Sequence, residues 1–90
     1  MRAAVVVDAR GLRCPLPVIR LAQRVRDLEP GTVVEVWATD PAAAADVPAW
    51  CRMRGQEYLG SREVSEGDDG REDGPRGDHT AYVVRVVAPG

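Results

Sequence analysis

The chain has 90 residues, enough for one small domain that buries about two-thirds of its unfolded surface. Hydrophobic residues make up 44% of it and charged residues 29%, which excludes a largely disordered chain. All 12 basic residues are arginine and the net charge is −2, which argues against nucleic acid as a direct ligand. No apolar run is long enough for a membrane span and the short apolar start is unlike a signal peptide. We therefore expect a cytoplasmic protein without direct membrane contact.

Cysteine and histidine are too scarce for a disulfide scaffold or a zinc site. The cysteines, Cys14 and Cys51, are far apart in the sequence, and His79 is the one histidine. The sequence therefore predicts no bound cofactor and no metal site. We expect Cys51 in the core, because it shares a helix face with Val47, and His79 in a solvated loop.

The first part of the chain predicts a strand, a helix and a second strand. Residues 3–8 form a short apolar run typical of a buried strand. From Pro15 onward, apolar residues recur with the period of a helix and form one stripe. The stripe contains Val18, Leu21, Ala22, Val25 and Leu28. A Pro-Gly pair at 30–31 ends this helix, and residues 32–39 predict a strand parallel to the first.

A second helix is predicted after the second strand. Asp40 and Pro41 are typical of an N-cap and a first helical residue, and residues 42–45 are all alanine. Pro48 predicts a kink or a restart of this helix, and Gly55 predicts its C-terminal cap.

The rest of the chain predicts two more strands. Residues 56–64 favour a strand, although Gly60 weakens it, and residues 80–87 are strongly β-branched. Between them, residues 65–79 carry six acids and two arginines and predict a long solvated loop. We therefore expect an α+β fold, with residues 1–90 in one domain. It is a two-layer α/β sandwich of order βαβαββ, with two helices on one face of a mixed four-stranded sheet.

Cys14 is the residue with the strongest chemical argument. It is predicted at or near the N-cap of the first helix, where unpaired N–H groups and the helix dipole stabilise a thiolate. Pro15 and Pro17 have no N–H, so the N–H groups of Leu16 and Val18 are the donors expected near the sulfur. The sequence therefore predicts an exposed thiol with a lowered pKa.

The charged residues around Cys14 support an electropositive site without a catalytic base. Arg10 and Arg13 are expected to add positive potential at the sulfur. Asp8 is the nearest carboxylate in sequence, and we assign it to hydrogen bonding within the loop. Cys14 therefore suits a group that arrives already activated, such as sulfane sulfur, which moves by the chemistry of thiol–disulfide exchange.

Exposed residues near Cys14 predict a docking surface. Leu16 lies nearly opposite the apolar stripe, and Arg20 and Arg24 also point outward. Leu12 either joins this surface or folds under the loop; the sequence leaves both open. A solvated face without a partner is the other interpretation of these arginines.

Three segments resemble the TusA/SirA-like sulfur-carrier family. They are residues 8–17, which contain Cys14-Pro15-Leu16-Pro17, the Asp40-Pro41 pair, and residues 46–51. The similarity runs from about Val5 to Val64 and resumes in the last strand. It implies the βαβαββ sandwich and a persulfide on Cys14 that is passed onward, while Cys51 matches a second cysteine that is not generally the carrier.

The resemblance also implies partners and an activity. The expected activity is that of a sulfurtransferase. The expected partners are a persulfide donor, which is a cysteine desulfurase or a rhodanese-like protein, and an acceptor sulfur-relay protein. Members of the family serve tRNA thiolation, molybdenum-cofactor synthesis, sulfur oxidation or selenium-related chemistry. The acidic loop at 65–79 is longer than in compact members.

Two other functions stay open from the sequence. A non-catalytic regulatory or interaction module of the same fold would not need the Cys14 thiol. A thiol redox protein would need Cys51 within about 7 Å of Cys14, measured between Cα atoms.

Overall fold

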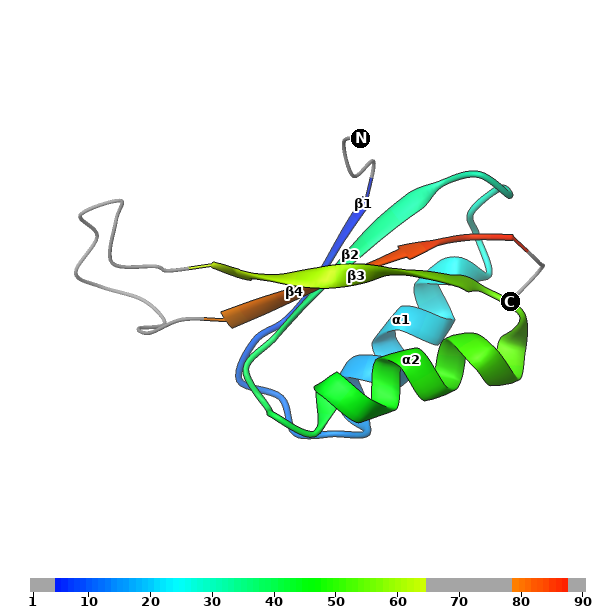
Figure 1. Cartoon of the computed structure of the whole chain (residues 1–90). Coiled ribbons are helices and arrows are strands. Elements are labelled where there is room, and N and C mark those ends of the chain that lie inside the picture. Colours follow the sequence, from blue (N-terminus) through cyan, green and yellow to red (C-terminus); the bar gives the residue numbers. More distant parts are fainter. Residues whose placement is uncertain (1–4, 65–78, 88–90) are drawn as a thin grey trace.

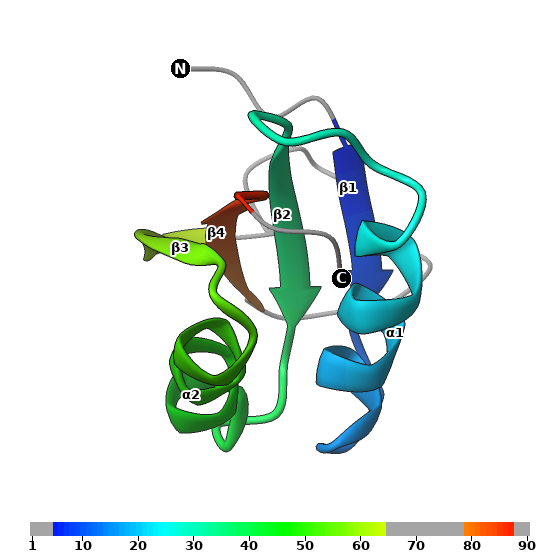
Figure 2. The same ribbon diagram turned by 90° about the vertical axis from the view of Figure 1, so that its right-hand side faces the viewer.

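The computed structural model describes residues 5–64 and 79–87 as a two-layer arrangement of helices on a sheet. In chain order the elements are β1 (Val5–Ala9), α1 (Leu16–Val25), β2 (Val33–Ala38), α2 (Ala43–Arg54), β3 (Glu57–Val64) and β4 (His79–Arg85). The strand order is β1-β2-β4-β3, with β1 parallel to β2 and the other pairs antiparallel. Both helices cover the same face of the sheet (Figures 1 and 2). The predicted α+β sandwich of order βαβαββ is confirmed.

The core lies between the helices and the sheet. Val34 and Val36 of β2 are fully buried against the helices. The alternate residues of this strand, such as Glu35, point to the opposite face of the sheet, here called the outer face. Leu21 and Val25 of α1 are also fully buried, as their helical stripe predicts. The remaining members of that stripe, which are half-buried against the core, are Val18, Ala22 and Leu28.

The second helix is continuous, although it contains a proline. Pro48 lies inside α2, so the predicted restart at this position is wrong. The proline leaves one carbonyl without an intrahelical partner, that of Ala44, which lies on an exposed residue and can be solvated. Cys51 is buried in the core, as expected, and so is Trp50. Gly55 caps the helix in the left-handed conformation, with φ of 75°.

The last two strands differ from prediction at one end. β4 begins at His79, a residue that is 4% exposed and that pairs in register with Val64, so the predicted solvated position of His79 is wrong. Strand pairing extends to His79, and the centroids of the Trp37 and His79 rings are 5.0 Å apart. Gly60 lies at a register shift in β3 and has φ of 125°, a backbone conformation that glycine adopts more readily than other residues. The acidic segment 65–78 lies outside the described residues.

Candidate functional site

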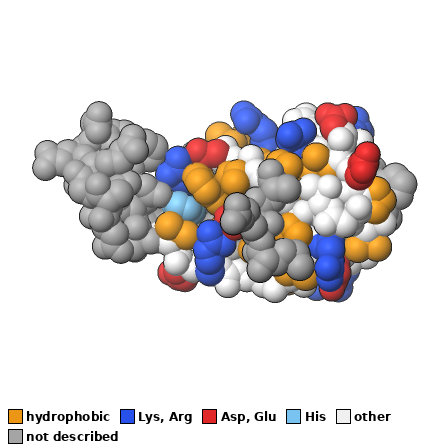
Figure 3. Space-filling view, turned by 90° about the horizontal axis from the view of Figure 1, so that it is seen from above, with side chains coloured by type: hydrophobic (Ala, Val, Ile, Leu, Met, Phe, Trp, Pro, Cys, Tyr) orange, Lys and Arg blue, Asp and Glu red, His pale blue; other side chains and the backbone are white. Residues whose placement is uncertain are grey.

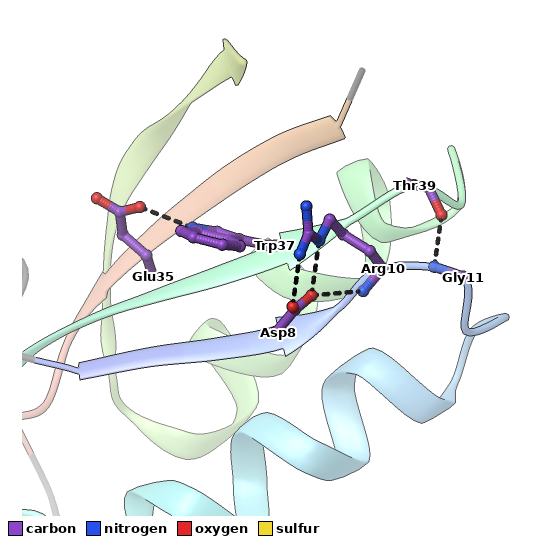
Figure 4. Close-up of polar contacts among 6 residues, drawn as sticks. All are labelled: Asp8, Arg10, Gly11, Glu35, Trp37 and Thr39. Atoms are coloured by element: carbon purple, nitrogen blue, oxygen red, sulfur yellow. Dashed lines mark hydrogen bonds and ion pairs between the residues drawn. The ribbon is translucent and has the colours of Figure 1, made fainter. Parts of the chain in front are cut away.

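Cys14 lies in the loop between β1 and α1, at the edge of the sheet where β1 and β2 both end. Because these strands are parallel, the residues that follow β2 reach the loop that follows β1. The Gly11 N–H donates to Thr39 Oγ1 at 2.9 Å (Figure 4), and the Cys14 N–H donates to Asp40 Oδ2 at 2.9 Å. Asp40 Oδ1 also accepts from the Ala42 N–H at 2.9 Å. One carboxylate therefore holds both the Cys14 backbone and the turn that leads into α2.

The start of α1 differs from the predicted arrangement around the sulfur. The N-cap is Pro15, so Cys14 lies directly before it, near the N-cap as predicted, and the peptide bond between these two residues is cis. The Leu16 N–H donates to the Arg13 carbonyl at 2.8 Å, so its predicted role as a donor to the sulfur is wrong. Pro17 is buried and contributes to the core packing of α1.

The Cys14 thiol lies in an environment that disfavours its charged form. Partial burial raises the pKa of Cys14 to about 11, together with a hydrogen bond to the Asp46 carboxylate and the negative charges of Asp46 and Asp40. The exposed thiol with a lowered pKa that the sequence predicts is therefore wrong on both points, because Cys14 is half-buried and its pKa is raised. The carboxylates come from α2 and the segment before it, which the sheet topology brings to the start of α1.

The two arginines predicted to favour a thiolate have other partners. The Arg10 guanidinium donates to the Asp8 carboxylate at 2.9 and 2.8 Å and lies 5.2 Å from the Trp37 ring centroid (Figure 4). Trp37 is on the outer face of the sheet, so the predicted support of the thiolate by Arg10 is wrong. Asp8 also accepts from the Arg10 backbone N–H at 3.2 Å, as a loop-forming carboxylate should. Arg13 is exposed. The hydrogen bonds from the Ala42 and Cys14 N–H groups lower the pKa of Asp40, and the charge of Arg13 makes a smaller contribution in the same direction.

The exposed side of α1 carries the predicted docking residues. Leu16 is 45% exposed, and Arg20 and Arg24 are exposed as expected. Ile19, which the sequence analysis did not single out, is 44% exposed on the same helix. Leu12 is half-buried and packs against the core, which settles the open alternative in favour of folding under the loop.

An open groove lies between α1 and α2. Two of its lining residues adjoin Cys14: Pro15 follows it in the chain, and Asp46 forms a hydrogen bond with its thiol. The volume of the groove is about 290 Å³. Pro15 and Val18 line it from the start of α1, and Asp46 lines it from the first turn of α2. The other lining residues, all from α2, are Ala49, Trp50 and Met53. Sequence reasoning did not single out Asp46 as a site residue. The predicted parallel pairing of β1 and β2 could have indicated it, because this pairing brings the starts of both helices to the same end of the sheet.

A second polar cluster lies on the outer face of the sheet. Glu35 is 9% exposed and accepts from Arg62 at 2.8 and 3.1 Å and from Trp37 Nε1 at 3.0 Å. The bonds from Arg62, followed by that from Trp37, hold the pKa of Glu35 below its usual value. Figure 3 shows this face, where charged side chains of both signs lie among hydrophobic ones. Within residues 5–64 and 79–87, no group of three or more His, Cys, Asp or Glu side chains could hold a metal ion.

The raised pKa of Cys14 gives a direct prediction for its reactivity. The rate of alkylation by iodoacetamide should rise with pH to a midpoint near 11, because the protonated thiol is unreactive. Mass spectrometry of the Cys14 peptide measures this rate separately from that of Cys51. A midpoint at or below that of an ordinary cysteine, about 8.5, would contradict the described surroundings of the thiol.

Comparison with known proteins agrees with the resemblance seen in the motifs. The model of the sulfurtransferase TusA family matches residues 5–70. The chain belongs to the TusA sulfurtransferase family. This membership indicates a role in sulfur transfer as a sulfur carrier, with partners that donate and accept sulfur. None of the described helices is long and apolar enough to cross a membrane.

Individual members of the TusA family show how far the similarity extends. The chain is 45% identical over 58 residues to the sulfur carrier protein TusA of Pseudomonas aeruginosa strain LESB58, which covers 64% of this chain and 73% of that protein. It is 47% identical over 57 residues to the TusA of Pseudomonas entomophila strain L48, covering 63% and 71% respectively. It is 44% identical over 66 residues to YrkF of Bacillus subtilis strain 168. That match covers 73% of this chain but 36% of YrkF, so the chain spans about a third of that relative.

Proposed function

We propose that Cys14 accepts sulfane sulfur as a persulfide and relays it to an acceptor protein. The observation that carries this proposal is the contrast between the two cysteines. Cys14 lies in a surface loop that Thr39 and Asp40 hold by its backbone, whereas Cys51 is 1% exposed inside the core. A sulfur atom on another protein can therefore meet Cys14 without any opening of α2.

The transfer is balanced without an external oxidant or reductant. The Cys14 sulfur attacks the outer sulfur of the donor's persulfide, and a new S–S bond forms as the donor's S–S bond breaks. The electron pair of the broken bond goes to the donor's cysteine sulfur, which takes up the proton that Cys14 has released through solvent. In the second step the acceptor's thiolate attacks the outer sulfur of the Cys14 persulfide, and Cys14 leaves as a thiolate.

The partners and setting follow the same proposal. The donor is a cysteine desulfurase or a rhodanese-like protein, and the acceptor is a sulfur-relay protein of tRNA thiolation, molybdenum-cofactor synthesis or sulfur oxidation. Both exchange sulfur in the cytoplasm, where cysteines stay reduced. We also propose that residues 1–90 form one TusA-like domain, with the acidic segment as an insertion between β3 and β4.

The exposed side of α1 is proposed as the surface that partners contact. Replacing Arg20 and Arg24 together by glutamate should slow sulfur transfer from an acidic-faced protein donor, most clearly at low salt, because charge mainly sets the encounter rate. Leu16→Ser should lower the rate of sulfur transfer at all salt concentrations, because it shortens the lifetime of the complex, which a buried apolar contact mainly sets. Transfer rates measured against ionic strength check both changes. Unchanged rates for both variants would place the docking surface elsewhere.

A chemical acceptor tests whether the loaded protein carries transferable sulfur. The protein is incubated with a persulfide donor, separated from it, and treated with cyanide, which removes sulfane sulfur as thiocyanate. One thiocyanate per chain is expected, since Cys14 carries one sulfur atom. No thiocyanate would contradict the carrier role and favour the non-catalytic module of the same fold.

A further inference from the structure

In the free protein, the surroundings of the proposed sulfur-carrying thiol disfavour its ionisation. Partial burial raises the pKa of Cys14, and the hydrogen bond to the Asp46 carboxylate and the charges of Asp46 and Asp40 raise it further. Attack on a persulfide needs the thiolate. A change at the site that favours the thiolate would therefore speed the transfer.

Burial by a partner cannot by itself supply that change. Covering the Cys14 loop removes water, and loss of water disfavours the charged thiolate further. The partner must instead add positive charge or remove negative charge near the sulfur. Asp46 is the place where this charge has the greatest effect, since it both bonds to the thiol and lines the open groove.

The groove has the form and chemistry to receive one kind of side chain. Among its lining residues only Asp46 is charged, and the walls are the apolar side chains of Val18, Trp50 and Met53 together with Pro15 and Ala49. Met53 is 78% exposed, so an apolar wall faces solvent. An aliphatic stem with a cationic end would cover the apolar wall and place its charge at the carboxylate.

We propose that the groove between α1 and α2 receives a lysine or arginine side chain of the protein that exchanges sulfur with Cys14, and that this cation pairs with Asp46 and releases the thiol from it. The inference rests on the proposed function of Cys14 and names the chemistry of its partner. Once Asp46 is paired, the thiol proton leaves to solvent and the thiolate attacks the persulfide. In the free protein the same carboxylate keeps Cys14 from reacting with small electrophiles.

Variants of the groove test the electrostatic part of this proposal. Asp46→Asn should lower the midpoint of Cys14 alkylation by about one pH unit, because it removes the nearby negative charge. At neutral pH the alkylation rate should rise only about threefold, because a less basic thiolate is also a weaker nucleophile. Ala49→Lys, which places a cation in the groove one helical turn from Asp46, should lower the midpoint in the same direction.

The matched controls decide between a specific pairing and a general effect of charge. Ala49→Met has a stem of similar length without charge and should leave the midpoint unchanged or raise it, because an apolar stem only removes water. Ala49→Lys added to Asp46→Asn should cause a clearly smaller decrease than in the unmodified protein, because the carboxylate that holds the cation beside the thiol is gone. Equal midpoints for the Lys and Met variants would overturn the proposal, and so would a full effect of lysine in the Asp46→Asn background.

A small probe tests the occupant itself without any substitution in the groove. Pentylguanidinium has an aliphatic stem and a permanent cation, as an arginine side chain does. It should shift the backbone amide resonances of Val18 and Ala49 saturably in the unmodified protein and much less in Asp46→Asn. Pentanol, which has the stem alone, should shift them more weakly. No saturable shift, or the same shift in both proteins or with pentanol, would overturn the proposed occupant.

The outcomes separate this inference from the function on which it rests. Alkylation and resonance shifts do not involve sulfur transfer. If these measurements agree while cyanide releases no sulfur from Cys14, the proposed function is wrong and the groove still binds a cation. If sulfur is released while the groove measurements fail, Cys14 is the carrier and another feature of the partner activates it.

Discussion

Replacement of Cys14 by serine is expected to abolish sulfur loading while the fold stays intact. Serine keeps the size and the backbone N–H that donates to Asp40, but its hydroxyl cannot form a persulfide. The fold should survive because Cys14 is only partly buried and belongs to a loop rather than to the centre of the core. Intact-mass spectrometry after incubation with a persulfide donor measures the gain of one sulfur atom, and amide resonances report the fold.

The other cysteine is the matched control for this substitution. Cys51→Ala should still gain one sulfur atom, although removal of a buried side chain from α2 lowers its stability. The loading result would contradict the account in either of two forms. One is normal loading of Cys14→Ser, and the other is loss of loading in a folded Cys51→Ala protein.

The second large effect concerns the packing of α1, which positions the Cys14 loop. Leu21 is fully buried between α1 and the sheet, so Leu21→Ala should lower the free energy of unfolding by about 2–5 kcal/mol. Small domains are stable by about 5–15 kcal/mol, so this is a substantial fraction of the total. The thermal midpoint should fall by at least about 8 °C, given a shift of about 4–8 °C per kcal/mol in a domain of this size.

A second leucine on α1 gives a control of identical chemistry. Leu16 is 45% exposed, and Leu16→Ala should change the free energy of unfolding by about 0.5 kcal/mol or less. Urea unfolding of both variants measures the difference. Similar losses for the two leucines would show that the described orientation of α1 is wrong.

Much of the fold could be predicted because local patterns and long-range packing agree. The apolar stripe of α1 recurs at helical spacing, and its central members Leu21 and Val25 are the ones that the structure buries completely. The β-branched runs around Val34 and Val84 predict the inner strands, and short connections predict the parallel pairing of β1 and β2. Cys14 itself stands out because it directly precedes a predicted helix.

The electrostatics of the site could not be predicted from residues near Cys14 in sequence. Its neighbours in sequence, Arg10 and Arg13, suggested a stabilised thiolate, but Arg10 is bound to Asp8 on the outer face of the sheet. Partial burial is the largest cause of the thiol's raised pKa, and the residues that raise it further, Asp46 and Asp40, belong to the next helix and to the turn before it. Their closeness depends on the packing of α2 beside α1, which periodicity alone does not give.

The local errors have similar physical causes. His79 follows an acidic, glycine-rich segment and has no β-branched neighbour before it, yet strand pairing with Val64 and contact with the Trp37 ring bury it. Pro48 predicted an interrupted helix, but the surrounding residues Val47, Trp50 and Cys51 are buried together, and their packing favours one continuous helix. In both cases tertiary contacts outweigh local preference.

The location of sulfane sulfur in the unmodified protein is the most direct measurement of the central claim. After incubation with a persulfide donor, labelling of persulfides and peptide mass spectrometry identify the cysteine that carries the additional sulfur atom. The account predicts that the sulfur is on Cys14 and that Cys51 stays an unmodified thiol. Sulfur found on Cys51, or on neither cysteine, would contradict it.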